Sequence, residues 1–81
     1  MLEKNQLDEL ISRCRTLLRE RPNHAYARWH LGRSLLLQER WALALEELMV
    51  LRRKFPDWAA SIDPLTKEAR SRLAGGDHAV V

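Results

Sequence analysis

The sequence predicts an all-α fold, an antiparallel helix-turn-helix array of four helices, and three observations predict it. Apolar residues recur at spacings of three and four, the period of an amphipathic helix, while no segment alternates with period two as a strand would. Pro22, Pro56 and the pair Gly75 and Gly76 each follow one periodic segment, where helix breakers are expected. The segments before Pro22 and Pro56 also match each other at an offset of 34 residues.

The first helix is expected over about residues 6–20. Asn5 can cap its start by accepting a bond from a free N–H of the first turn. Pro22 ends it, because the residue before proline disfavours helical dihedral angles. Six apolar residues of this segment fall on one stripe of the helix: Leu7, Leu10, Ile11, Cys14, Leu17 and Leu18.

A second helix is expected to follow Asn23 and to end near Gln38. It contains Gly32, although glycine inside a helix costs about 1 kcal/mol relative to alanine. Because glycine has no side chain, we expect a neighbouring helix to approach closely there. The third helix is expected to begin near Trp41 and to end before Pro56. Its core stripe is Ala44, Leu45, Leu48 and Leu51.

The fourth helix has two candidate starts. Asp57 can cap a helix that begins at Trp58 and bends at Pro64, or a short turn can precede a helix over 64–74. Gly75 and Gly76 would then stop the helix. We therefore expect one domain over residues 1–74 and a flexible C-terminal tail over 75–81. The expected buried face of this helix is Leu65, Ala69 and Leu73.

Length, charge and cysteine content indicate a small single-domain protein of a reducing compartment. The 81 residues suffice for one domain, and the net charge is +3. Apolar runs such as Leu35 to Leu37 are too short to span a membrane, and the N-terminus lacks the pattern of a signal peptide. Cys14 has no second cysteine with which to form an internal disulfide, which fits a reducing compartment. We expect a cytoplasmic protein.

No catalytic, cofactor or metal site is expected, and hence no enzyme. The sequence has no Gly-rich phosphate loop, no nucleophile elbow and no zinc-protease motif. Cys14 lies in the apolar stripe of the first helix and is expected to be a buried structural residue. The adjacent Glu46 and Glu47 are expected to be solvated. Four potential ligands lack the spacing of a zinc site: Cys14, His24, His30 and His78.

Residues 25–58 resemble one complete repeat of the tetratricopeptide repeat (TPR) family, whose helix-turn-helix units recur every 34 residues. The sequence departs from the family pattern at Arg28, which stands at the early Trp, at Leu35, which replaces the usual Tyr, and at Glu39, which replaces the usual turn Gly. A four-helix antiparallel bundle is the structural alternative. The repeat-packing positions that carry the resemblance are Leu31, Gly32, Trp41, Ala44, Leu48, Leu51 and Pro56.

The resemblance implies a protein-binding function on the face lined by the first helix of each repeat. Residues 6–24 and 59–74 resemble half repeats that flank the complete one, so the helix after Asn23 would supply this face. Tyr, Trp and Arg are the residues most enriched at interface hot spots. The candidate binding residues share one side of this helix by 3.6-residue geometry: Tyr26, Trp29, His30, Arg33 and Leu37.

This face would suit an acidic peptide or protein segment, or one that ends in a free carboxylate. Arg33 would pair with the carboxylate, Tyr26 or His30 would donate a hydrogen bond, and Trp29 would pack on an apolar side chain. Arg33 stands where family members that clamp peptide carboxylates often have a basic residue, whereas His30 replaces their typical Asn.

Other readings of the same residues stay open. Tyr26 and Trp29 can instead pack against the last helix or another subunit. Nucleic-acid binding is less favoured, because acids flank the basic run 52–54. We also expect a homo-oligomer, most simply a homodimer, because the chain has more large apolar residues than four short helices easily bury; a stable monomer and a fragment of a longer protein are the alternatives. The large apolar residues concerned are Trp29, Trp41, Trp58, Leu36, Leu37, Leu43 and Met49.

Overall fold

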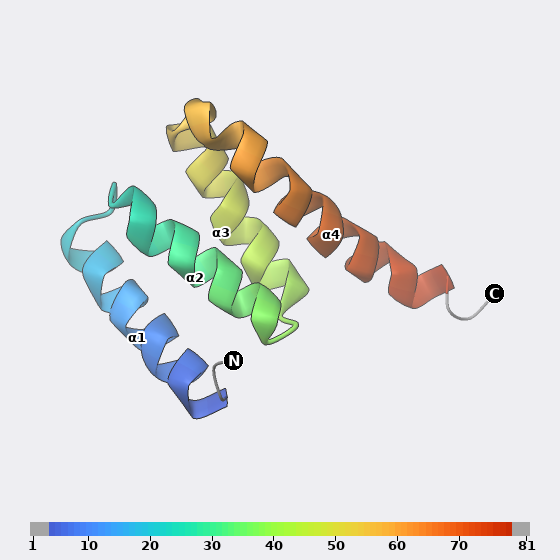
Figure 1. The fold of residues 1–81 in the computed structure, drawn as a ribbon, viewed down its shortest axis with the longest axis horizontal. Coiled ribbons are helices and arrows are strands. Elements are labelled where there is room, and N and C mark those ends of the chain that lie inside the picture. Colours follow the sequence, from blue (N-terminus) through green and yellow to red (C-terminus); the bar gives the residue numbers. More distant parts are fainter. Residues whose placement is uncertain (1–3, 79–81) are drawn as a thin grey trace.

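A computed structural model describes the backbone of residues 4–78, and it confirms an all-α fold with four helices and no strand within that range. The helices follow one another along an elongated, flat molecule of about 45 × 31 × 20 Å (Figure 1). In chain order the elements are α1 (Lys4–Glu20), α2 (Ala25–Leu37), α3 (Trp41–Lys54), the 3₁₀ turn η1 (Pro56–Trp58) and α4 (Ala59–His78). None of these helices is both long and apolar enough to cross a membrane.

Each helix packs chiefly on the helices next to it in sequence. α1 packs on α2, α2 on α3, and α3 on α4, so that α2 and α3 form the middle of the array and α1 and α4 lie at its two ends (Figure 1). Two hollows follow from this order. One lies where α1 and α3 flank α2, and the other where α2 and α4 flank the start of α3.

The core consists of two clusters that meet along α2 and α3. The first joins α1, α2 and α3 through Ile11, Cys14, Leu31, Leu35 and Ala44. The second joins α3 and α4 through Leu48, Leu51 and Ile62, with Trp29 and Trp58 among the half-buried residues packed against it. Five of the seven repeat-packing positions are buried, Trp41 is half-buried, and Pro56 is exposed as the first residue of η1.

Gly32 of α2 lies in close contact with Leu48 of α3. A Cβ built at this glycine would lie 2.7 Å from Leu48 Cδ2 and 2.9 Å from Leu48 Cγ, closer than carbon atoms can pack. Leu48 is itself fully buried, so its side chain has little freedom to move away. The expectation that Gly32 marks close packing with a neighbouring helix is therefore confirmed.

Two of the connecting turns use residues that sequence rules do not single out. The N-cap of α2 is His24, whose Nδ1 accepts a bond from the backbone N–H of Ala27 at 3.0 Å. This satisfies one of the free donors at the helix start. Between α2 and α3, Glu39 has φ 60°, the left-handed conformation that glycine adopts most readily. Glu39 therefore holds the backbone shape of a turn in which the TPR pattern has glycine.

The last helix differs from its predicted course. α4 begins at Ala59 after η1, continues through Pro64 and runs past Gly75 to His78, so the predicted stop at the glycine pair is wrong. A glycine stop needs a left-handed residue, and no glycine in the described range has a positive φ. Of the predicted tail 75–81, residues 75–78 are helical, and 79–81 lie outside the described residues.

The buried face of α4 is also rotated from the predicted one. Leu73 was expected to be buried, but 45% of it is exposed, because the C-terminal part of α4 projects past the other helices (Figure 1). Ala69 is buried as expected and Leu65 is half-buried, while Ile62 and Thr66 are buried although they were not predicted to be. Thr66 is tolerated there because its hydroxyl donates to the Asp63 carbonyl at 3.0 Å.

Candidate functional site

Four of the five predicted binding residues lie exposed along one side of α2. Tyr26 is 64% exposed and Leu37 63%, while His30 and Arg33 between them are also exposed. Trp29 is half-buried. Along this side of α2, the aromatic residues Tyr26 and Trp29 come first, Arg33 provides a positive charge in the middle, and the apolar Leu37 lies at the end.

The aromatic end rests on Trp58, a residue of η1. The Tyr26 and Trp29 rings meet the Trp58 ring edge-on at centroid distances of 5.1 and 6.0 Å, and the Phe55 ring lies 6.3 Å from the Trp58 ring. Such arrangements stabilise aromatic pairs by about 0.5–1.5 kcal/mol beyond area burial. Trp29 thus contributes to packing as well as to the surface, because it contacts Trp58 of η1 and packs against the core cluster that includes Ile62 of α4.

Arg33 is the charged centre of this side of α2. Its guanidinium lies 5.9 Å from the centre of the Trp29 ring, within the range of a cation–π contact. No carboxylate pairs with it among the described residues. The guanidinium is thus held in place on an aromatic surface while its hydrogen-bond donors face solvent.

A hollow of about 190 Å³ adjoins Arg33 between α2 and α4. Leu37 and Leu65 provide apolar walls, and Glu68 stands at the α4 side. Glu68 makes a long ion pair of 3.9 Å with Arg72, which in turn lies over the Trp41 ring. The lining residues are Arg33, Leu36, Leu37, Trp41, Leu65 and Glu68.

The sequence analysis did not assign Trp58, Leu65 or Glu68 to this site. A signal was available, because the offset of 34 residues aligns Leu31 with Leu65 and so makes α4 the counterpart of α2. This alignment does not determine which α4 residues face α2, because that depends on the rotation of α4 about its own axis.

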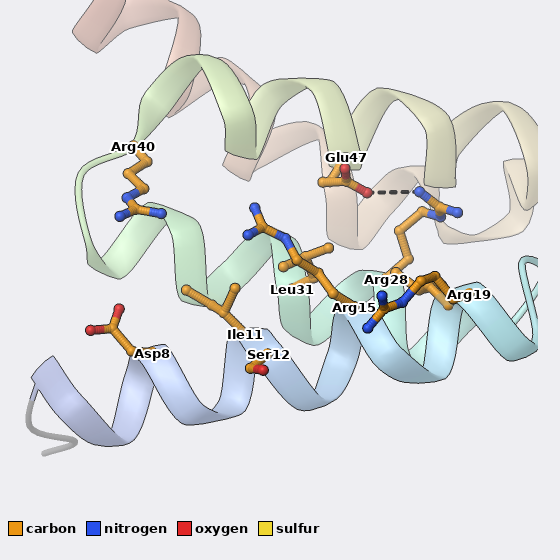
Figure 2. Close-up of a pocket in the computed structure, with 10 residues that line it drawn as sticks. Asp8, Ile11, Ser12, Arg15, Arg19, Arg28, Leu31, Arg40 and Glu47 are labelled. Atoms are coloured by element: carbon orange, nitrogen blue, oxygen red, sulfur yellow. Dashed lines mark hydrogen bonds and ion pairs between the residues drawn. The ribbon is translucent and has the colours of Figure 1, made fainter.

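The second hollow is a groove of about 590 Å³ in which α1 and α3 flank α2 (Figure 2). Glu47, expected to be solvated, is half-buried at its edge, because Arg28 of α2 donates to it at 2.7 Å. Glu46 is exposed as expected. The lining residues are Asp8, Ile11, Ser12, Arg15, Leu18, Arg19, Arg28, Leu31, Arg40 and Glu47.

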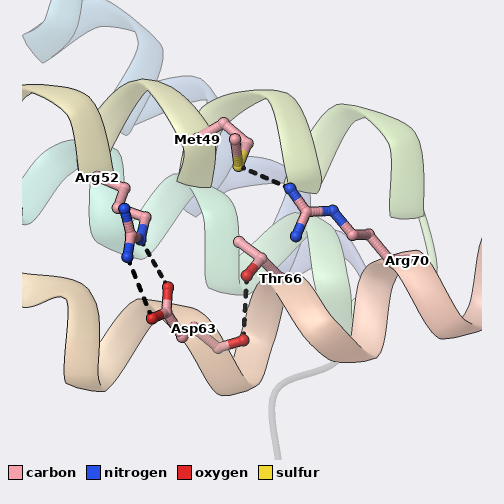
Figure 3. A network of polar contacts seen from close by, with 5 residues as sticks. All are labelled: Met49, Arg52, Asp63, Thr66 and Arg70. Carbon is pink, nitrogen blue, oxygen red and sulfur yellow. Dashed lines mark hydrogen bonds and ion pairs between the residues drawn. The ribbon is translucent and has the colours of Figure 1, made fainter.

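The basic run 52–54 does not form a continuous positive stripe. Arg52 makes two bonds to the Asp63 carboxylate of α4, at 2.7 and 3.4 Å (Figure 3). Lys54 donates to the Asn23 side chain at 2.7 Å. Only Arg53 of the three lacks a side-chain partner among the described residues, which gives little support to phosphate-backbone binding.

Metal binding and thiol chemistry gain no support from the described part of the chain. No group of three or more His, Cys, Asp and Glu side chains in it could hold a metal ion. Burial raises the pKa of the Cys14 thiol, which keeps it protonated and unreactive.

Comparisons of the chain with protein-family models, with curated proteins and with solved structures find no significant match. The geometry of the chain itself is therefore what bears on its function.

Proposed function

We propose that this chain is a protein-interaction module of the TPR type, and not an enzyme, which binds a peptide or protein segment through the α2 side that faces α4. The observation that carries the proposal is the placement of Arg33. It is exposed, unpaired with any carboxylate in the described residues, and in cation–π contact with Trp29 beside the hollow between α2 and α4. A guanidinium that already rests on an aromatic ring loses less side-chain entropy when a carboxylate binds.

The neighbouring residues suit the rest of such a segment. Leu37 and Leu65 line the hollow and would take an apolar side chain of the ligand. Tyr26 offers its hydroxyl and an exposed ring at the other end of α2, held by Trp58. The ligand would therefore carry a carboxylate opposite Arg33 and an apolar side chain next to it. With a single buried cysteine, the module suits a reducing compartment such as the cytoplasm.

The second candidate is a self-associating domain whose dimer interface is the same side of α2. The exposed Leu37 and Tyr26 favour it. Against it, five of the seven large apolar residues that suggested a dimer are already half-buried, and only Leu37 and Leu43 remain exposed. The apolar excess that motivates a dimer is thus smaller than the sequence implies.

The experiment is a selection from a random-peptide library displayed with free C-terminal carboxylates, followed by calorimetric titration of the enriched peptides. We expect enrichment of acidic residues with an apolar neighbour. Arg33→Glu should weaken binding at least about tenfold, or about 1.4 kcal/mol. Arg53→Glu makes the same charge change at an unpaired arginine outside this hollow and should alter affinity less than about twofold.

Trp29 is unsuitable for this test, because its half-buried ring also supports the core. Leu37→Ser is the better second variant, since Leu37 is mostly exposed, and Leu43→Ser is its matched control on α3. The proposal fails if no peptide is enriched, or if Arg33→Glu and Arg53→Glu weaken binding equally.

A further inference from the structure

The groove between α1 and α3 has a positive charge that its own acids do not neutralise. Its lining includes four arginines and two carboxylates. Both carboxylates are already engaged. Glu47 pairs with Arg28 at 2.7 Å, and Asp8 accepts a hydrogen bond from the Gln38 side chain at 2.5 Å. The remaining three arginines have no ion pair in the described residues.

These three arginines come from two separate elements and follow one another along the groove (Figure 2). Arg40 stands just before α3, and Arg15 and Arg19 lie one turn apart on α1. All three are exposed, and the one side-chain bond among them joins Arg19 to Thr16 at 3.3 Å. Three like charges directed into one concave space attract an anionic ligand more strongly than the same charges spread over a flat surface.

The base of the groove is apolar. Ile11 and Leu31 are almost fully buried core residues whose surfaces reach the groove, and Leu18 beside them is half-buried. A volume of about 590 Å³ also lies within the roughly 300–1,000 Å³ of typical ligand sites. The groove therefore combines apolar contact area with a row of guanidinium groups.

We propose that this groove binds an acidic peptide segment whose carboxylates pair with Arg15, Arg19 and Arg40 while apolar side chains between them rest on Ile11, Leu18 and Leu31. Guanidinium groups bind carboxylates through paired, charge-assisted hydrogen bonds. The groove has mixed chemistry, with apolar patches and with Asp8 and Glu47 at its edges. A nucleic-acid backbone would gain nothing from the apolar base, whereas a peptide with apolar side chains would.

This site is separate from the one proposed above. Arg28 and Leu31 of α2 face the groove, whereas Arg33 and Leu37 line the hollow beside α4. Successive residues are rotated by about 100° around the helix axis, so the side chains of Leu31 and Arg33 point in directions about 160° apart. The same helix therefore presents opposite sides to the two sites, and either proposal can fail while the other holds.

The probe is a short synthetic peptide in which Glu alternates with Leu and Ser. Its binding is compared with that of a control peptide in which Gln replaces each Glu. In NMR spectra, the Glu peptide should shift the Nε–Hε signals of Arg15, Arg19 and Arg40 and leave that of Arg53 in place. The double variant Arg15→Glu with Arg40→Glu should lose at least about tenfold in affinity. The matched control, Arg53→Glu with Lys67→Glu, makes the same charge change outside the groove and should lose less than about twofold.

Several outcomes would overturn the proposal. Equal losses in the two double variants would mean that only overall charge attracts the peptide, and equal binding of the Gln peptide would remove the role of the carboxylates. Loss on Arg33→Glu alone would place the peptide beside α4. Tighter binding of a thymidine oligonucleotide, with shifts at the same arginine signals, would make the groove a nucleic-acid surface. If circular dichroism shows that the variant Arg15→Glu with Arg40→Glu is unfolded, the variant Arg15→Gln with Arg40→Gln replaces it.

Discussion

At the scale of single residues, Gly32 and Leu48 set the distance between α2 and α3. The Leu48 side chain occupies the space in which a Cβ of residue 32 would lie. This contact explains why a glycine stands inside a helix where alanine would favour the helix by about 1 kcal/mol. The packing gain at the crossing outweighs the local helix preference.

We predict that Gly32→Ala destabilises the protein although it improves helix propensity. Overpacking a full core costs typically about 1–3 kcal/mol, against a propensity gain of about 1 kcal/mol, so the net loss should be up to about 2 kcal/mol. Urea unfolding followed by circular dichroism measures it. In a Leu48→Ala background the clash is absent, and Gly32→Ala should become neutral or stabilising. The same loss in both backgrounds would contradict the contact with Leu48.

The residues that the sequence predicts well are those whose role depends on local spacing. Gly32 is one, because its position inside a periodic helix has a single simple explanation. The pair of Arg28 and Glu47 is not, since it joins two helices across 19 residues of chain. Its formation depends on how far each helix is rotated about its axis, and no local pattern encodes that rotation.

At the scale of the elements, α4 shows where local rules stop. The rules for proline and glycine predict a start or bend at Pro64 and an end at Gly75, yet α4 begins at Ala59, before Pro64, and runs past Gly75. Pro64 removes one backbone bond inside α4, and burial of Ile62, Thr66 and Ala69 offsets this loss. Tertiary packing thus decides the extent of this helix.

Polar contacts between α3 and α4 add to that packing. Besides the Arg52 pair with Asp63, Arg70 of α4 approaches the Met49 sulfur at 3.3 Å (Figure 3). The hydrogen bond from Arg52 holds the pKa of the Asp63 carboxyl below its usual range, and the charge of Arg52 adds to this effect. The pair is exposed, so solvent and salt weaken it.

We predict a small, salt-sensitive loss of stability in acid that depends on Asp63. Because the pKa of Asp63 is lower in the folded than in the unfolded chain, its contribution is present above the unfolded pKa of about 3.9 and is lost as the pH falls through the folded pKa. The measurement is the urea midpoint of wild type and Asp63→Asn between about pH 6 and pH 2. The difference between them should shrink in acid and in high salt. Asp57→Asn, at an acid without an ion pair, serves as the control, and an equal effect there would refute the role of the Arg52 pair.

At the scale of the whole molecule, the described chain leaves few large apolar side chains on its surface. The exposed positions of α1 are polar apart from Leu17, and Leu73 is the only large apolar residue among those of α4. The outer faces of the two end helices therefore resemble solvated surfaces, which repeat arrays need at their ends. Lateral contact through α2 is the remaining route to a dimer.

We predict that light scattering after size exclusion gives a molar mass near 9.5 kDa at two concentrations tenfold apart. The physical reason is that Leu17 and Leu73 are the only large apolar side chains exposed on α1 and α4 among the described residues, which is too little apolar surface for stacking a second copy. A mass near twice that value would favour the self-associating candidate instead. In that case Leu37→Ser should restore the monomer and Leu43→Ser should not.

The sequence predicts the order of the helices and most of the core, but not the groove between α1 and α3. Periodicity marks buried positions such as Leu31, Ala44 and Leu48 because each buried face repeats along its own helix. The arginines of the groove belong to different elements, and each looks like an ordinary solvated residue in its local context. Only the packed array brings Arg15 and Arg40 to one concavity.

The neighbour-to-neighbour packing of the helices has a consequence for hydrogen exchange. α1 and α4 each pack chiefly on one partner helix, whereas α2 and α3 each pack on two. We therefore expect the backbone amides of α1 and α4 to exchange through local opening, and those of α2 and α3 to exchange more slowly. Opening of α1 removes the arginine groove and leaves the hollow beside Arg33 intact, while opening of α4 does the reverse. Local unfolding of one end helix would therefore abolish one of the two binding surfaces and leave the other intact.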